Sequence, residues 1–326
     1  MKRLLCLILI LANINFIYAT TTKHKKHQHK HRHKASQTAQ VAAVAATTAD
    51  NTTPSMLATD EEHSINPALD KINFKAIANQ PRLYSYSALA VNADNGEILV
   101  SKHQNAKLPI ASISKLMTAM VLLDSKANLD EYVTISSADV DTLRNTYSRL
   151  RVGMALKRRD LLLLALMSSE NRAAFAIART AYPQGITYFI KKMNEKALNL
   201  GMSHTQFYDP TGLTKSNQST AEDLAKMVQA AFTYPEIRAD TTTKGADVVL
   251  GKNYTHHYMN SDALVRAGKL QIALSKTGFI NEAGHCLVLY SLVDKQSVIM
   301  VFLNSAGKSG RLIDAITVKN YIQSLS

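Results

Sequence analysis

The chain has 326 residues, of which 46% are hydrophobic and 19% are charged, so a sizeable core is possible and disorder over the whole length is excluded. The net charge is +13, but residues 1–34 hold eight Lys and Arg and no acidic residue, which leaves 30 basic and 25 acidic residues elsewhere. This distribution excludes a basic nucleic-acid-binding surface over the whole body. With only Cys6 and Cys286, a disulfide scaffold and a cysteine-rich zinc module are excluded too.

The first 19 residues have the pattern of a secretory signal peptide. Lys2 and Arg3 precede an apolar run that starts at Leu4 and leads to the small residue Ala19. The run is short and two asparagines interrupt it, which disfavours a membrane span. We expect residues 1–19 to direct export to the periplasm and to be removed. The alternative is an uncleaved anchor.

A tail is predicted over residues 20–65. Residues 23–34 contain six Lys and Arg and five His, and an Ala/Thr-rich stretch follows. The tail has few large apolar residues and no helical or strand period, so it buries too little surface to offset the entropy of ordering. We expect a disordered cationic tether that contacts anionic wall polymer or membrane. Metal binding by the histidines is the alternative, which the clustered cations oppose.

From about residue 66 the pattern becomes globular, and we expect one catalytic domain over residues 66–326. An Asn-Gly turn between two apolar runs predicts a β-hairpin, and 3/4 apolar spacing predicts helices. A capping box at Ser219–Glu222 opens one of them. The expected strands are 83–91, 97–101, 270–275, 286–293 and 297–304, and the expected helices are 112–123, 159–167, 172–180, 186–200, 219–232 and 311–325. Strands at both ends with helices between them predict an α+β fold in which a helical region covers one antiparallel sheet.

The first candidate for chemistry is a serine and a lysine three residues apart. Ser112 and Lys115 lie one turn apart at the start of a predicted helix, where the dipole favours developing negative charge. A lysine that is desolvated can be neutral and can activate a serine as a nucleophile. Alone the motif is weak, because Ser305 and Lys308 also match it.

Two further polar motifs have plain structural interpretations when each is taken alone. Ser169-Glu170-Asn171 separates two apolar helical segments, where a serine or asparagine also serves as a helix cap. Lys276-Thr277-Gly278 follows a predicted strand, where glycine lets a ligand approach the backbone and the lysine offers charge to a carboxylate.

The three motifs together, in this order and in these contexts, resemble the signature of penicillin-recognising serine acyltransferases. The second serine is 57 residues after the first, and the third motif begins 107 residues later. The flanking segments at 105–111, 166–168 and 209–213 are similar as well. The chain resembles a low-molecular-mass penicillin-binding protein of the D-alanyl-D-alanine carboxypeptidase/endopeptidase family. It is most similar to the short endopeptidase branch, because 48 residues follow Gly278.

The resemblance implies a β-lactamase/transpeptidase-like fold with the active site between sheet and helical region. It implies that Ser112 attacks a D-Ala carbonyl to form an acyl-enzyme on peptidoglycan stem peptides. It requires no metal or organic cofactor and makes β-lactams covalent inhibitors. The implied roles are general base for Lys115, proton relay for Ser169, substrate binding and lysine orientation for Asn171, carboxylate binding for Lys276 and Thr277, and a backbone oxyanion hole next to Gly278, at Phe279 and Ser112.

Single features of the sequence suggest rival functions. Glu195 and Asn199 spell the deacylation element of a β-lactamase, but the helical spacing around them favours a helix surface. Gly307-Lys308-Ser309 lacks the earlier glycine of a P-loop, which excludes nucleotide binding there. A catalytically silent wall-binding protein of the same fold remains open. Ser112, Lys115 and Lys276 argue against it.

Overall fold

The computed structural model describes residues 80–251 and 254–325. The signal peptide and the tether predicted from the sequence lie outside the described residues, and both stay predictions. Among the described residues, no helix is long and apolar enough to cross a membrane.

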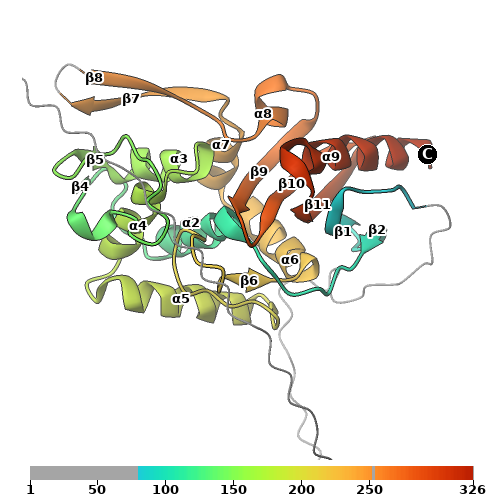
Figure 1. Ribbon diagram of the computed structural model, residues 1–326, viewed down its shortest axis with the longest axis horizontal. Coiled ribbons are helices and arrows are strands. Elements are labelled where there is room, and N and C mark those ends of the chain that lie inside the picture. Colours follow the sequence, from blue (N-terminus) through green and yellow to red (C-terminus); the bar gives the residue numbers. More distant parts are fainter. Residues whose placement is uncertain (1–79, 252–253, 326) are drawn as a thin grey trace, which may run out of the picture. The chain divides into compact units, whose positions relative to one another are not determined.

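A five-stranded antiparallel sheet forms one half of the domain (Figure 1). Its order is β2-β1-β11-β10-β9, so the N-terminal hairpin joins the edge of a C-terminal meander. The junction is the pairing of β1 with β11, in which Ser85 lies opposite Ser305. The strands are β1 (Ser85–Asn92), β2 (Ile98–Lys102), β9 (Gln271–Ile280), β10 (Gly284–Val293) and β11 (Gln296–Ser305). All five predicted strands are confirmed, and β9 is longer than predicted.

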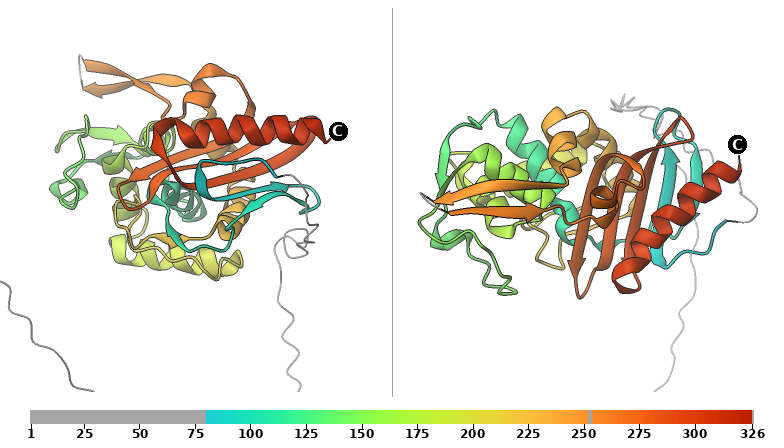
Figure 2. Two further views of the ribbon diagram at one scale, coloured as in Figure 1. Left: turned by 45° about the vertical axis from the view of Figure 1, so that its right-hand side comes forward. Right: turned by 90° about the horizontal axis from the view of Figure 1, so that it is seen from above.

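Both faces of this sheet are covered. Helix α9 (Gly307–Ser324) packs on one face, and α6 (Ala221–Phe232) packs on the other (Figure 2). Because neither face is open to water, the central strands are nearly continuous apolar runs rather than alternating ones. Asp314 of α9 accepts bonds from the backbone N–H of Tyr84 and from the N–H and hydroxyl of Ser85, all within 2.8 Å. This fixes the start of β1 to the last helix.

The helical half is built around α2 (Ser114–Asp124), whose residues are buried from Ser114 to Leu122. A helix that is apolar on all sides belongs in the interior. The helices α3 (Arg158–Met167), α4 (Asn171–Thr180) and α5 (Gly185–Asn199) pack around it. These spans confirm the predicted helices to within one or two residues.

Three local expectations are wrong. The last helix, α9, begins at Gly307 rather than at residue 311. Ser112 lies in a separate 3-10 turn, η1 (Ala111–Ile113), rather than inside the following α-helix. The cap of α6 is Thr220 rather than Ser219, because the Thr220 hydroxyl accepts the N–H of Asp223 at 3.1 Å. The Ser219 hydroxyl bonds that of Thr205 instead, at 2.7 Å.

The stretch between α6 and β9 contains elements that the sequence did not reveal. Helix α7 (Pro235–Thr242) leads into a hairpin of β7 (Gly245–Gly251) and β8 (Tyr254–Met259), followed by α8 (Ala263–Ala267). The hairpin projects over the helical half (Figure 1). The shorter elements are β3 (Leu108–Pro109), β4 (Tyr132–Thr134), η2 (Ser137–Asp139), β5 (Ala155–Lys157) and β6 (Gln218–Ser219).

Candidate active site

The turn that carries Ser112 is held between two glycines. A Cβ on Gly212 would lie 1.8 Å from the carbonyl oxygen of Ala111, and one on Gly278 would lie 3.1 Å from the backbone N of Ser112. Ala111 itself has a positive φ of 48°. Only residues without a side chain allow this close approach, so the serine is fixed between the loop at Gly212 and strand β9.

Lys115 lies at the centre of the site with no exposed surface. Its Nζ donates to Ser112 Oγ at 2.8 Å, to Asn171 Oδ1 at 2.8 Å and to the carbonyl of Thr211 at 2.9 Å. Asn171 in turn donates through Nδ2 to Thr146 Oγ1 at 3.0 Å. The lysine therefore connects the nucleophile candidate to the helical half.

Burial lowers the pKa of Lys115 from 10.5 to about 7, although Asp209 and Glu170 act in the opposite direction. Desolvation disfavours the charged amine, and two carboxylates offset only part of that penalty. An amine that loses its proton near neutral pH, 2.8 Å from a serine hydroxyl, is able to accept the proton of that hydroxyl.

Asp209 organises the loop that provides the Thr211 carbonyl. One of its oxygens accepts the N–H of Thr211 at 2.6 Å and of Gly212 at 2.7 Å, and the other accepts that of Thr214 at 2.9 Å. The sequence showed this segment only as a flank of the motifs. Its role depends on backbone groups, which the residue types do not reveal.

A second lysine–serine pair faces the first. Lys276 of β9 donates to Ser169 Oγ at 3.0 Å and to the Thr277 carbonyl at 3.2 Å, and it is 1% exposed. Burial and the nearby Lys115 lower its pKa well below 10.5. Ser169 has a positive φ of 64°, an uncommon conformation for a residue other than glycine. It is held there at the point where α3 gives way to α4.

The rest of the third motif lies along β9, an edge strand among the described strands. Thr277 Oγ1 donates to Ser261 Oγ at 2.8 Å, and Ser261 N donates to the Met167 carbonyl at 2.8 Å. Phe279 is 52% exposed and stacks on His285 with ring centroids 4.4 Å apart. An edge strand presents unpaired backbone groups on one side, where an extended peptide is able to pair.

Comparison with known proteins agrees with this geometry. The family model of D-alanyl-D-alanine carboxypeptidase matches residues 73–307. The chain belongs to this family. It is accordingly a serine D,D-peptidase, and the family resemblance, the α+β fold and the enzyme class predicted from the sequence are confirmed.

Named relatives and solved structures agree with the assignment. A D-alanyl-D-alanine endopeptidase of Pseudomonas aeruginosa is 44% identical over 245 residues, which is 75% of this chain and 79% of the relative. One of Escherichia coli K12 is 41% identical over 257 residues, with 78% and 83% covered. The Streptomyces K15 DD-transpeptidase structure has a TM-score of 0.70 at 31% identity, covering 75% of this chain and 98% of that one.

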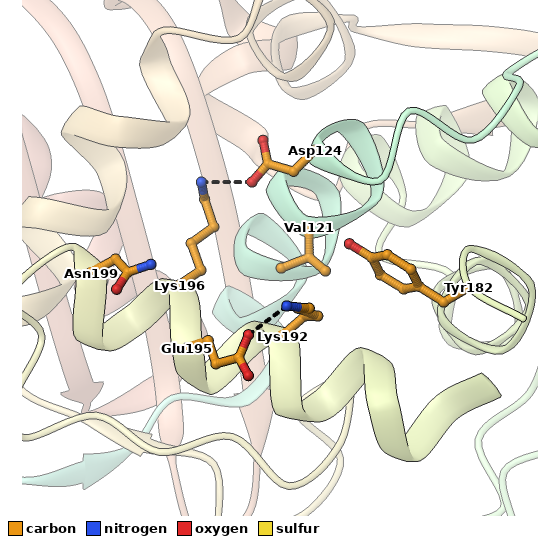
Figure 3. Close-up of a pocket in the computed structure, with 7 residues that line it drawn as sticks. All are labelled: Val121, Asp124, Tyr182, Lys192, Glu195, Lys196 and Asn199. Carbon is orange, nitrogen blue, oxygen red and sulfur yellow. Dashed lines mark hydrogen bonds and ion pairs between the residues drawn. The ribbon is translucent and has the colours of Figure 1, made fainter. Parts of the chain in front are cut away.

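The β-lactamase-like pattern of this D,D-peptidase lies away from Ser112. Glu195 is on α5 and pairs with Lys192 at 2.7 Å. Both line a cavity of about 240 Å³ at the end of α2 opposite the Ser112 turn (Figure 3). Lys196 and Asp124 also line it and pair at 2.8 Å. Glu195 is thus committed to a lysine of its own helix.

The second serine–lysine match in this D,D-peptidase is not a second site. Ser305 ends β11 with a buried hydroxyl, whereas Lys308 lies exposed on α9. Cys286 is buried and free, and burial raises its pKa to about 11. Among the described residues, no group of three or more His, Cys, Asp or Glu is arranged to hold a metal ion.

The predicted site residues fall into three groups. Ser112, Lys115 and Asn171 form one hydrogen-bonded set, and Ser169 and Lys276 form a second. Thr277, Gly278 and Phe279 lie beside them on β9. Sequence reasoning missed Thr146 and Ser261, because isolated polar residues in loops carry no spacing signal. It included Asp209 and Thr211 only in a flanking segment, with no role assigned.

Proposed function

We propose that this D,D-peptidase hydrolyses peptidoglycan stem peptides through an acyl-enzyme on Ser112. The observation that carries the proposal is the 2.8 Å hydrogen bond between Ser112 Oγ and a buried lysine whose pKa is about 7. A serine needs a base close to neutrality at this distance, and Lys115 meets both requirements.

The acylation step is as follows. Lys115 takes the hydroxyl proton of Ser112, and Oγ bonds to the D-Ala carbonyl carbon. The C–N bond then breaks, and the leaving amine gains a proton that Ser169 relays. Water later attacks the ester, which releases the D-Ala acid and restores the serine. Asn171 orients Lys115 by accepting its hydrogen bond at 2.8 Å and binds the substrate amide.

Two sets of groups bind negative charge on the substrate, one for the oxyanion and one for the carboxylate. The backbone N–H groups of Ser112 and Phe279 form the oxyanion hole, because Gly278 lets β9 approach the serine turn. Lys276 and Thr277 bind the carboxylate of the leaving group. An arriving carboxylate favours the protonated form of Lys276, opposing the desolvation that lowers its pKa.

The preferred substrate is the D-alanyl–meso-diaminopimelyl cross-link, with removal of terminal D-Ala weaker or comparable. The support is the similarity to two relatives named endopeptidases, at 44% and 41% identity. β-Lactams acylate Ser112, and the resulting ester is hydrolysed slowly. The opened ring keeps the leaving amine next to the ester, where it blocks the approach of water. We further propose a periplasmic location after export, with the basic tail in contact with an anionic wall or membrane surface.

The deciding experiment incubates the purified protein with cross-linked peptidoglycan and separates the products by mass. Loss of dimeric muropeptides supports the endopeptidase assignment, whereas release of D-Ala from monomers without loss of dimers reverses the order of substrates. Ser112→Ala should abolish hydrolysis, and Ser305→Ala should not change it.

Penicillin labelling tests the two alternatives. Brief incubation with benzylpenicillin should give one lasting adduct on the peptide that contains Ser112. Absence of any adduct would favour a silent wall-binding protein. Rapid turnover of penicillin would favour a β-lactamase.

A further inference from the structure

Arg149 lies between two tyrosine rings at the edge of the site. Its Cζ is 5.4 Å from the centre of the Tyr147 ring and 6.0 Å from that of Tyr258. The side chain is exposed, and among the described residues no carboxylate pairs with it. A guanidinium held against aromatic faces keeps its fork of donors available to a carboxylate in solution.

Tyr258 has a buried hydroxyl without a partner. The residue is 3% exposed, and its hydroxyl has no hydrogen bond within the described part of the chain. Burial raises the pKa of Tyr258, and the nearby Glu170 raises it further, so the hydroxyl stays protonated. Burial raises the pKa of Glu170, although Lys115 and Arg172 act in the opposite direction. Glu170 Oε1 is buried without a partner as well, so both unpaired groups lie in the interior next to the ring that holds Arg149.

Both residues belong to segments that also contribute to the site, and Tyr258 interacts electrostatically with Glu170, the residue between Ser169 and Asn171. Thr146, three residues before Arg149, accepts the Asn171 bond at 3.0 Å. Tyr258 lies on β8, three residues before Ser261, whose hydroxyl accepts from Thr277 at 2.8 Å. The hairpin of β7 and β8 lies against β5 and the loop that precedes it (Figure 1).

The chemistry of the two possible leaving groups differs at this position. In the proposed mechanism, the leaving amine is at Ser169 and its carboxylate is at Lys276 and Thr277, and Thr277 contacts Ser261, which follows β8. A terminal D-Ala has only a methyl group to extend. A diaminopimelyl stem continues as a peptide that bears further carboxylates, and it has no free amine of its own before cleavage.

We propose that Arg149, held by Tyr147 and Tyr258, is a specificity residue that binds a carboxylate of the leaving stem and so selects cross-links over single stems. This inference rests on the proposed function. Tyr258 contributes its ring face, because its hydroxyl oxygen is buried. The selection is a difference in transition-state binding between the two substrates, because a leaving D-Ala does not reach this position.

The test compares Arg149→Gln with the wild type on three reactions. These are cleavage of a purified D-alanyl–diaminopimelyl dimer, release of D-Ala from the monomeric pentapeptide, and acylation by benzylpenicillin. We expect kcat/KM on the dimer to fall about tenfold, the low end of a hydrogen bond between charged groups. The other two rates should change less than about twofold, since neither leaving group reaches Arg149.

Matched variants make the result specific. Arg151→Gln removes an exposed charge from the same loop and should leave the dimer rate unchanged. Tyr258→Phe keeps the ring that holds Arg149 and should change the dimer rate less than about twofold. Equal losses on all three reactions, or no loss on the dimer, would overturn the specificity role while the proposed function stands. A wild-type protein that neither cleaves the dimer nor accepts penicillin would overturn both.

Discussion

Arg144 and Glu282, 138 residues apart in the chain, form an ion pair of 2.8 Å between Nη2 and Oε2. Arg144 belongs to the loop of the helical half, and Glu282 belongs to the turn that follows β9. Arg144 also donates through Nε to the Leu213 carbonyl at 2.6 Å. One side chain therefore connects three segments that surround the Ser112 turn.

This connection predicts a salt-dependent effect on activity. Glu282→Gln should raise KM a few-fold with little change in Tm, because an exposed pair adds little stability but positions the loop. Steady-state kinetics at 0.05 M and 0.5 M salt would measure it, and the difference from wild type should shrink as salt rises. An unchanged KM at low salt would show that the pair has no role in binding.

The pKa of Lys115 predicts a pH profile for acylation. The amine is protonated and inactive below its pKa, so the rate of penicillin acylation should rise with pH and reach half its plateau at about pH 7. Rapid mixing with benzylpenicillin, quenching after set times and mass spectrometry of the adduct give this rate. Glu170→Gln removes one carboxylate that raises the pKa, so the midpoint should move to lower pH. A midpoint that stays in place or rises would contradict this electrostatic assignment.

Gly212 and Gly153 both have a positive φ, but only Gly212 lies against the turn that carries Ser112, so Gly153 serves as a control. Gly212 has a φ of +81° and a Cβ there would lie 1.8 Å from a backbone oxygen, whereas Gly153 has a φ of +91° and open space. Gly153→Ala should cost only the strain of the conformation, about 1 kcal/mol. Gly212→Ala should also displace the Ser112 turn and lower acylation at least about a hundredfold. Similar acylation rates in both variants would show that the turn tolerates the displacement.

Asp314 is expected to be important for stability. It is fully buried and accepts three hydrogen bonds from Tyr84 and Ser85. Asp314→Ala leaves these donors unpaired, so the free energy of unfolding should fall by about 3 kcal/mol or more. Urea unfolding measures the loss, with the exposed Asp94→Ala as control. A loss equal to that of the control would mean that water replaces the carboxylate at no cost.

The sequence determined the elements whose signal is local. The spacing of Ser112 and Lys115, the Asn-Gly hairpin and the apolar C-terminal strands depend on neighbours a few residues away. The three motifs in order were sufficient to predict the family and the eight site residues. The region of β7 and β8 escaped prediction because this hairpin is half exposed and its apolar residues, such as Val248 and Leu250, are buried only by packing on the helical half.

Only the tertiary structure decided how the site works. The pKa of Lys115 depends on desolvation by residues from the whole chain, and the sequence alone does not specify burial. The contacts of Thr211 with Lys115 and of Thr146 with Asn171 join loops that are 96 and 25 residues away. Backbone carbonyls and single loop hydroxyls have no pattern of their own. Their roles arise when packing brings them within about 3 Å of a polar group that needs a partner.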